Sequence, residues 1–136
     1  KSGEWRFTPP THVVAALAAA LDQLHDEGGV AARNARYSEN CSILVDGMTA
    51  MGFRTYLSHN FQAPIIVTFH TPDDPAFDFR QFYDGLQHRG FTIYPGKLTQ
   101  ADSFRIGCIG QVFPDDMRAA LAAVAEMRAE MGMTAR

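Results

Sequence analysis

Apolar residues recur every three or four positions in four segments of the chain, which is the spacing of amphipathic helices. These segments are residues 11 to about 26, about 30 to 51, about 78 to 89, and a last one that begins near Pro114. Glycines at 28, 29, 52 and 90 follow the first three, and glycine commonly ends a helix. The sequence therefore predicts four helices.

Each predicted helix has an apolar stripe that we expect to face a core. The predicted stripe positions are Val13, Leu17, Leu21 and Leu24 in the first helix, Tyr37, Cys41, Leu44, Met48 and Met51 in the second, Phe79, Phe82, Tyr83 and Leu86 in the third, and Met117, Leu121, Val124 and Met131 in the last.

Short segments between the helices have the composition of strands. They are residues 53–57, 65–69, 91–94 and 104–109. The resulting order, ααββαββα, predicts an α+β fold in which helices cover a small, mostly antiparallel sheet.

Composition narrows the function classes. The chain has 136 residues, 46% of them hydrophobic and 20% charged, as in an ordinary globular domain. Twelve Lys and Arg against 15 Asp and Glu give a net charge of −3, so no overall basic field attracts nucleic acid. The longest apolar stretch, Val13 to Leu21, is too short to span a bilayer. We therefore expect neither nucleic acid nor a membrane as a partner.

The two cysteines indicate the cellular compartment, and the first residue indicates whether the chain is complete. Cys41 and Cys108 are far apart among apolar neighbours, which favours buried thiols in a reducing cytoplasm over a disulfide. The chain starts at Lys1 rather than at Met, which predicts that further residues precede it.

Arg105 is the most informative single residue. Strand alternation over 104–109 places Phe104, Ile106 and Cys108 on one face and Arg105 with Gly107 on the other. A guanidinium is well shaped to bind a carboxylate or phosphonate through two hydrogen bonds, and Gly107 leaves room beside it. A surface arginine, or one paired with a carboxylate of its own domain, is the alternative, and the spacing alone favours it.

Other candidate residues have weaker signals. Lys97, in the loop Tyr94-Pro95-Gly96-Lys97-Leu98-Thr99, is better explained as a solvated lysine than as a Schiff-base lysine. Thr8, just before the first helix, has a hydroxyl that can contact a phosphate or cap a turn, and Trp5 has the character of an interface residue. The five histidines have no metal-ligand spacing, so we expect no metal site.

Four stretches of the sequence resemble those of a known protein family. They are Gly3-Glu4-Trp5-Arg6-Phe7-Thr8-Pro9-Pro10-Thr11-His12-Val13, Glu27-Gly28-Gly29-Val30, the Tyr94–Thr99 loop and Ser103-Phe104-Arg105-Ile106-Gly107-Cys108-Ile109-Gly110. In this order they resemble the C-terminal third of the 2-aminoethylphosphonate–pyruvate transaminases, which are class V, fold-type I enzymes dependent on pyridoxal 5'-phosphate (PLP). The Thr-Pro-Pro and Arg-Ile-Gly elements also occur in alanine–glyoxylate and serine–pyruvate aminotransferases.

The resemblance implies a domain rather than a complete enzyme. Residues 1–10 would be a leading segment from a large domain, and residues 11–136 the C-terminal small domain. The Schiff-base lysine of the family would lie upstream of Lys1, so this piece alone is expected to be inactive.

The resemblance also implies ligands and partners. The complete enzyme would be a cytoplasmic homodimer that uses PLP to move the amino group of 2-aminoethylphosphonate to pyruvate. Arg105 matches the arginine that binds the anionic end of the substrate, Thr8 a contact to the PLP phosphate of the partner subunit, and Trp5 a neighbouring aromatic. The alternatives are an alanine–glyoxylate or serine–pyruvate type domain, or a non-catalytic module that binds small anions.

Overall fold

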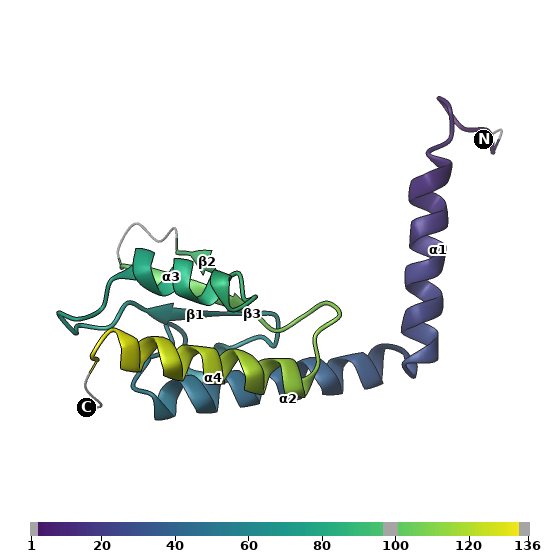
Figure 1. Ribbon diagram of the computed structural model, residues 1–136. Coiled ribbons are helices and arrows are strands. Elements are labelled where there is room, and N and C mark those ends of the chain that lie inside the picture. Colours follow the sequence, from purple (N-terminus) through teal and green to yellow (C-terminus); the bar gives the residue numbers. More distant parts are fainter. Residues whose placement is uncertain (1–2, 97–100, 134–136) are drawn as a thin grey trace. The chain divides into compact units, whose positions relative to one another are not determined.

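The computed structural model describes residues 3–96 and 101–133 (Figure 1). It has the element order α1 (Thr11–Asp26), α2 (Gly29–Ala50), η1 (His59–Phe61), β1 (Ile66–His70), α3 (Phe79–His88), β2 (Tyr94–Pro95), β3 (Ser103–Gly107) and α4 (Pro114–Glu130). The chain divides into two units, residues 1–35 and 36–136, and α2 crosses the boundary.

The first unit consists of the N-terminal segment, α1 and the start of α2. Helix α1 has the predicted bounds, but none of its residues is buried. Val13, Leu17 and Leu21 remain 67%, 59% and 54% exposed. Gly28 and Gly29 have φ of +101° and +79°, backbone that residues with a side chain rarely adopt, and they form the turn into α2. The predicted stripe therefore exists on α1, and the first unit does not cover it.

The second unit contains a three-stranded antiparallel sheet in the order β1-β3-β2. This confirms the predicted mostly antiparallel sheet. The central strand, β3, pairs Arg105 with Thr68 of β1 and with Tyr94 of β2. Residues directly opposite each other in such a ladder share a face, so these three side chains project from the same side.

The core lies on the other face of the sheet. Val67, Phe69, Phe104 and Ile106 alternate with more exposed residues and are 8% exposed or less. The ring of Phe104 lies 5.5 Å from that of Phe82 in α3, and buried residues of α2 and α4 complete the same cluster. Helices α2, α3 and α4 and one apolar face of the sheet share this core, which is the architecture of an α+β domain.

The predicted strand at 53–57 is wrong. Only Thr55 forms a bridge, to Phe69, and the segment is otherwise joined to β1 by Tyr56 N–H to Thr68 O at 2.8 Å and His70 N–H to Arg54 O at 2.9 Å. The observed order is therefore ααβαββα, with η1 before β1.

The bounds of the other three strands also differ from the prediction. The strand expected at 91–94 begins only at Tyr94, because the amide of Phe91 is bonded to Leu86 O at the end of α3. The strands expected at 65–69 and 104–109 are found at 66–70 and 103–107. Hydrogen bonding continues one step past β3, since Cys108 N–H donates to Ile65 O at 2.9 Å.

The helices of the second unit agree closely with the sequence pattern. Cys41, Leu44 and Met48 of α2 are buried, as are Phe82 and Leu86 of α3. Helix α4 buries Met117 and Val124 as predicted, and also Ala120, Ala123 and Met127, whereas Leu121 is only half-buried. Among the described helices, none is long and apolar enough to cross a membrane.

Candidate functional site

Arg105 occupies the centre of the sheet face that lies opposite the core. Its flanking residues Phe104 and Ile106 are buried, so the strand holds the Arg105 side chain on the other face, as the sequence predicts. A Cβ added to Gly107 would meet no atom within 4 Å, so space is open two residues further along the same face.

Among the described residues, the guanidinium of Arg105 has one partner, which is neutral. Its Nη2 donates to Pro95 O at 3.3 Å, while its Nε is buried and has no hydrogen-bond partner in the same part of the chain. Within residues 3–96 and 101–133 no carboxylate forms an ion pair with it. The carbonyl contact orients the side chain but leaves its positive charge uncompensated, so the group is available to an anion.

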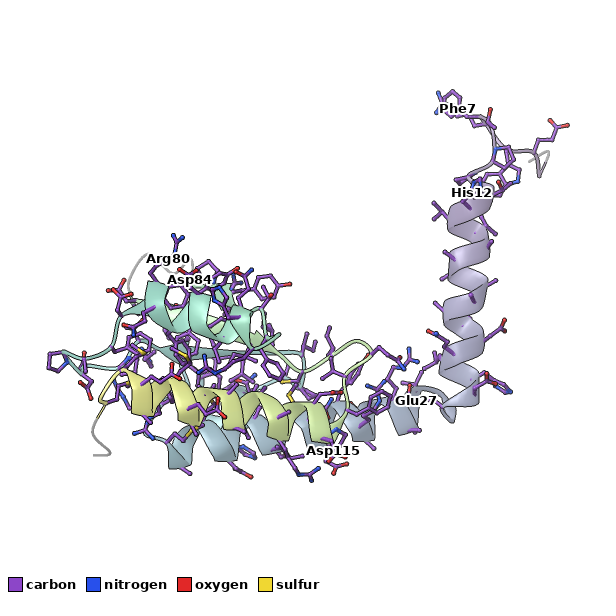
Figure 2. All side chains as sticks on the ribbon, in the orientation of Figure 1. Phe7, His12, Glu27, Arg80, Asp84 and Asp115 are labelled. Atoms are coloured by element: carbon purple, nitrogen blue, oxygen red, sulfur yellow. The ribbon has the colours of Figure 1, made fainter. Side chains whose placement is uncertain are left out.

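Several other arginines of the same unit are neutralised by their own fold. Arg80 pairs with Asp84 at 2.7 Å on the outer surface of α3 (Figure 2), and Arg118 pairs with Asp115 at 2.7 Å in α4. Arg89, at the end of α3, binds Glu126 at 2.9 Å and also contacts Glu130. These side chains are explained by surface ion pairs, and Arg105 is not.

The segment after β3 is held by two polar side chains of α2. Arg36 Nη1 donates to Gly110 O at 2.9 Å and Val112 O at 2.6 Å, and its guanidinium lies 4.7 Å from the ring centre of Phe113. Asn40 is fully buried, and its Nδ2 donates to Cys108 O at 3.1 Å and Val112 O at 2.9 Å. Together they fix the backbone that leaves the Arg105 strand.

The sequence pattern alone did not single out either of these residues. Asn40 did carry a signal, because it lies three residues after Tyr37 and four before Leu44, inside the apolar stripe of α2. A polar residue at a core position must find a partner, which points to a structural role. Arg36 carried no comparable signal, since its partners are carbonyl groups about 75 residues further along the chain.

The two cysteines are buried free thiols, as predicted. Burial is the main cause that raises the pKa of Cys41, and it raises the pKa of Cys108 to about 12. Because the thiolate is the reactive form, neither residue is a nucleophile near neutral pH.

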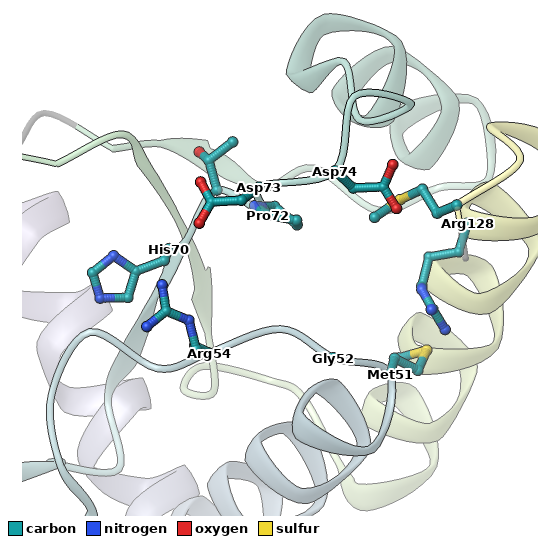
Figure 3. A pocket seen from close by; sticks show the side chains of 10 residues that line it. Met51, Gly52, Arg54, His70, Pro72, Asp73, Asp74 and Arg128 are labelled. Carbon is teal, nitrogen blue, oxygen red and sulfur yellow. The ribbon is translucent and has the colours of Figure 1, made fainter. Parts of the chain in front are cut away.

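A separate hollow of about 230 Å³ lies between the end of α2, the turn after β1 and the end of α4 (Figure 3). Arg54, His70 and Arg128 line it together with Asp73 and Asp74. Its carboxylates offset its guanidinium groups, so it has no net preference for an anion. Arg105 is not among its lining residues.

The remaining predicted residues are placed as follows. Trp5 is 63% exposed, and Phe7 is 76% exposed (Figure 2). Thr8, between Phe7 and α1, is also exposed, and all three residues belong to the first unit. Lys97 lies outside the described residues. In the part of the chain that the structure describes, no group of histidine, cysteine or acidic residues could hold a metal ion.

Solved structures define the class of protein. Pyridoxamine–pyruvate aminotransferase from Mesorhizobium loti superimposes with a TM-score of 0.84 at 26% identity, over 98% of this chain and 34% of that one. Alanine–glyoxylate aminotransferase from Nostoc sp. does so with a TM-score of 0.79 at 19% identity, over 91% of this chain and 33% of that one. The chain has the fold of the small α+β domain of fold-type I aminotransferases.

Sequence relatives narrow the assignment. A 2-aminoethylphosphonate–pyruvate transaminase from Burkholderia lata is 58% identical over 98% of this chain, and one from Pseudomonas putida is 57% identical over 96%. The chain spans 36% of the length of each relative. No model of a protein family matches it. The chain is a homologue of the 2-aminoethylphosphonate–pyruvate transaminases that corresponds to about a third of their length.

Proposed function

We propose that this chain is the C-terminal small domain of a 2-aminoethylphosphonate–pyruvate transaminase, with residues 1–10 leading in from a large domain and residues 11–136 forming the small one. The complete protein would transfer the amino group of 2-aminoethylphosphonate to pyruvate, giving phosphonoacetaldehyde and alanine. The identity of 57–58% to transaminases of that name supports this assignment over an alanine–glyoxylate type domain.

Within this reaction the proposed role of Arg105 is to bind the anionic end of each substrate. The observation that carries this role is the guanidinium that the described fold leaves without a carboxylate partner. Both the phosphonate of the donor and the carboxylate of the acceptor suit a fork of N–H donors. Binding this end would orient the reacting carbon of either substrate in the same way.

The proposed cofactor is PLP, which supplies an electron sink when it is bound. Thr8 is proposed to contact its phosphate across a homodimer boundary, and Trp5 is proposed to be a neighbouring aromatic of the cofactor site at the same boundary. Both side chains are exposed and so available for these contacts. The sequence contains only Lys1 and Lys97, and we propose that the Schiff-base lysine belongs to the large domain instead. We further propose a cytoplasmic enzyme with no nucleic-acid or membrane partner.

The assignment of Arg105 is tested by Arg105→Ala in the full-length protein. Loss of a charge-assisted contact to the substrate is expected to cost about 1.5–3 kcal/mol, or about 10- to 150-fold in kcat/KM, for both substrates. Steady-state kinetics with 2-aminoethylphosphonate and pyruvate measure this.

A matched control is Arg118→Ala, because Arg118 is an exposed arginine paired on its own helix. This variant is expected to keep wild-type kinetics. Unchanged kinetics of Arg105→Ala with both substrates would rule out the proposed role.

A further inference from the structure

Three side chains form a row across the sheet on the face opposite the core. Arg105 of β3 lies directly between Thr68 of β1 and Tyr94 of β2. Side chains opposite each other in an antiparallel ladder have Cβ atoms about 5 Å apart and lie side by side. Arg105 therefore has a hydroxyl-bearing neighbour on either side.

The two neighbours differ in how far they extend from the sheet. Arginine and tyrosine both carry their polar groups at the far end of a long side chain. Threonine is short, so its hydroxyl stays near the backbone. Tyr94 is 56% exposed, and no residue in the described ranges forms a hydrogen bond with its hydroxyl group. Of the two neighbours, Tyr94 is therefore the better placed to donate to a ligand held at the tip of Arg105.

The surroundings of this row favour an anion. The three strands have the sequences Ile-Val-Thr-Phe-His, Tyr-Pro and Ser-Phe-Arg-Ile-Gly, so no carboxylate projects from them. The strand that carries Tyr94 also supplies the Pro95 carbonyl that holds Arg105 Nη2. Strand β2 therefore carries the hydroxyl group of Tyr94 and also positions the guanidinium of Arg105.

The number of donors bears on which anion is preferred. Nε of Arg105 is buried and Nη2 already contacts Pro95, so an incoming anion meets the outer N–H groups of the fork. Two such donors match the two oxygens of a carboxylate. A phosphonate has a third oxygen. This oxygen loses its hydrogen bonds to water on binding, so it needs another protein donor to avoid a loss of binding free energy.

On the basis of the proposed function, we propose that Tyr94 donates its phenol hydrogen bond to the third phosphonate oxygen of the amino donor. Tyr94 is then a specificity-determining residue that favours the phosphonate over the carboxylate. Arg105 serves both substrates, and Tyr94 distinguishes them.

The test is Tyr94→Phe in the full-length protein, which removes the hydroxyl group and keeps the ring. Ethylphosphonate and propionate serve as probes, because they carry the two anionic groups and lack the amino group. The inhibition constant for ethylphosphonate is expected to weaken about 10- to 100-fold, the effect of one hydrogen bond to a charged group. That for propionate should change less than about twofold, and KM for 2-aminoethylphosphonate should rise while KM for pyruvate does not.

Tyr56→Phe is the matched control. It makes the same chemical change at the opposite edge of the sheet, where Tyr56 lies 5.3 Å from His70 by ring centres. It should leave both inhibition constants unchanged. A Tyr94→Phe variant that weakens both probes equally, or neither, overturns the proposal.

The two proposals fail in different ways. A wild-type full-length protein that does not convert 2-aminoethylphosphonate contradicts the proposed function itself. An active wild type that is impaired by Arg105→Ala, but whose Tyr94→Phe variant shows no selectivity, contradicts only the role of Tyr94.

Discussion

Asn40 connects α2 to the end of the Arg105 strand. Its Nδ2 bonds two carbonyl groups, and its Oδ1 is buried without a partner among the described residues. A buried oxygen without a hydrogen bond lowers the stability of the fold. We therefore infer that the two hydrogen bonds donated by the amide nitrogen of Asn40 outweigh this loss. Asn40 therefore stabilises the path of residues 108–112 at the expense of its own oxygen.

We predict that Asn40→Ala lowers the free energy of unfolding by about 1–3 kcal/mol, because Cys108 O loses its side-chain donor while remaining buried. Urea unfolding of the isolated chain measures the change. Asn34→Ala, on an exposed part of the same helix, is the control and should have a much smaller effect. Equal unfolding midpoints for the two variants would contradict the structural role of Asn40.

At the scale of elements, the short strand β2 depends on a close backbone approach. Gly96 follows β2, and its amide donates to Ser103 O at 2.7 Å. A Cβ at Gly96 would lie 2.2 Å from that same carbonyl oxygen. Backbone atoms of a central strand cannot move aside as the end of a flexible side chain can, so glycine is required there.

We predict that Gly96→Ala separates β2 from β3 and destabilises the chain by about 1–3 kcal/mol, the usual cost of overpacking. Thermal unfolding gives the loss of stability, and amide hydrogen exchange at Arg105 reports the separation. Gly107→Ala is the matched control, because it adds a Cβ to the same sheet where no atom lies within 4 Å. The explanation fails if Gly107→Ala is as destabilising as Gly96→Ala.

For the whole molecule, the most informative surface is α1. A helix of 16 residues with no buried side chain does not obtain its stability from packing within the first unit. Its exposed apolar residues, Val13, Val14, Leu17 and Leu21, are a surface suited to contact with another protein surface. This agrees with a chain that corresponds to about a third of its relatives.

We predict that the isolated chain self-associates through this helix in a concentration-dependent manner. Sedimentation velocity should show species larger than a monomer, and the double substitution Leu17→Asp and Leu21→Asp should shift the chain to monomer. Ala16→Asp with Ala20→Asp is the control, because it adds the same charge to α1 without removing large apolar side chains. A compact monomer of the unsubstituted chain at all concentrations would contradict this prediction.

The amino-acid sequence by itself determined the helices and the buried faces of most of them. Helical periodicity and glycine stops are local, because each helical hydrogen bond joins residues four apart, and the bounds of α1 and α2 agreed with the pattern within one residue. Alternation within one strand likewise placed Phe104 and Ile106 inward and Arg105 outward. The sequence also contained the four motifs that resemble those of the 2-aminoethylphosphonate–pyruvate transaminases.

Only the tertiary structure decided which strands formed and which residues surround Arg105. Strand formation depends on partners distant in the sequence, so the segment at 53–57 was reduced to one bridge and β2 to two residues. Asn40, Arg36 and Tyr94 gained their significance in the same way, from groups that the chain brings back over tens of residues or from the neighbouring strand. Local spacing carries no information on such contacts, because packing and strand register are properties of the folded chain as a whole.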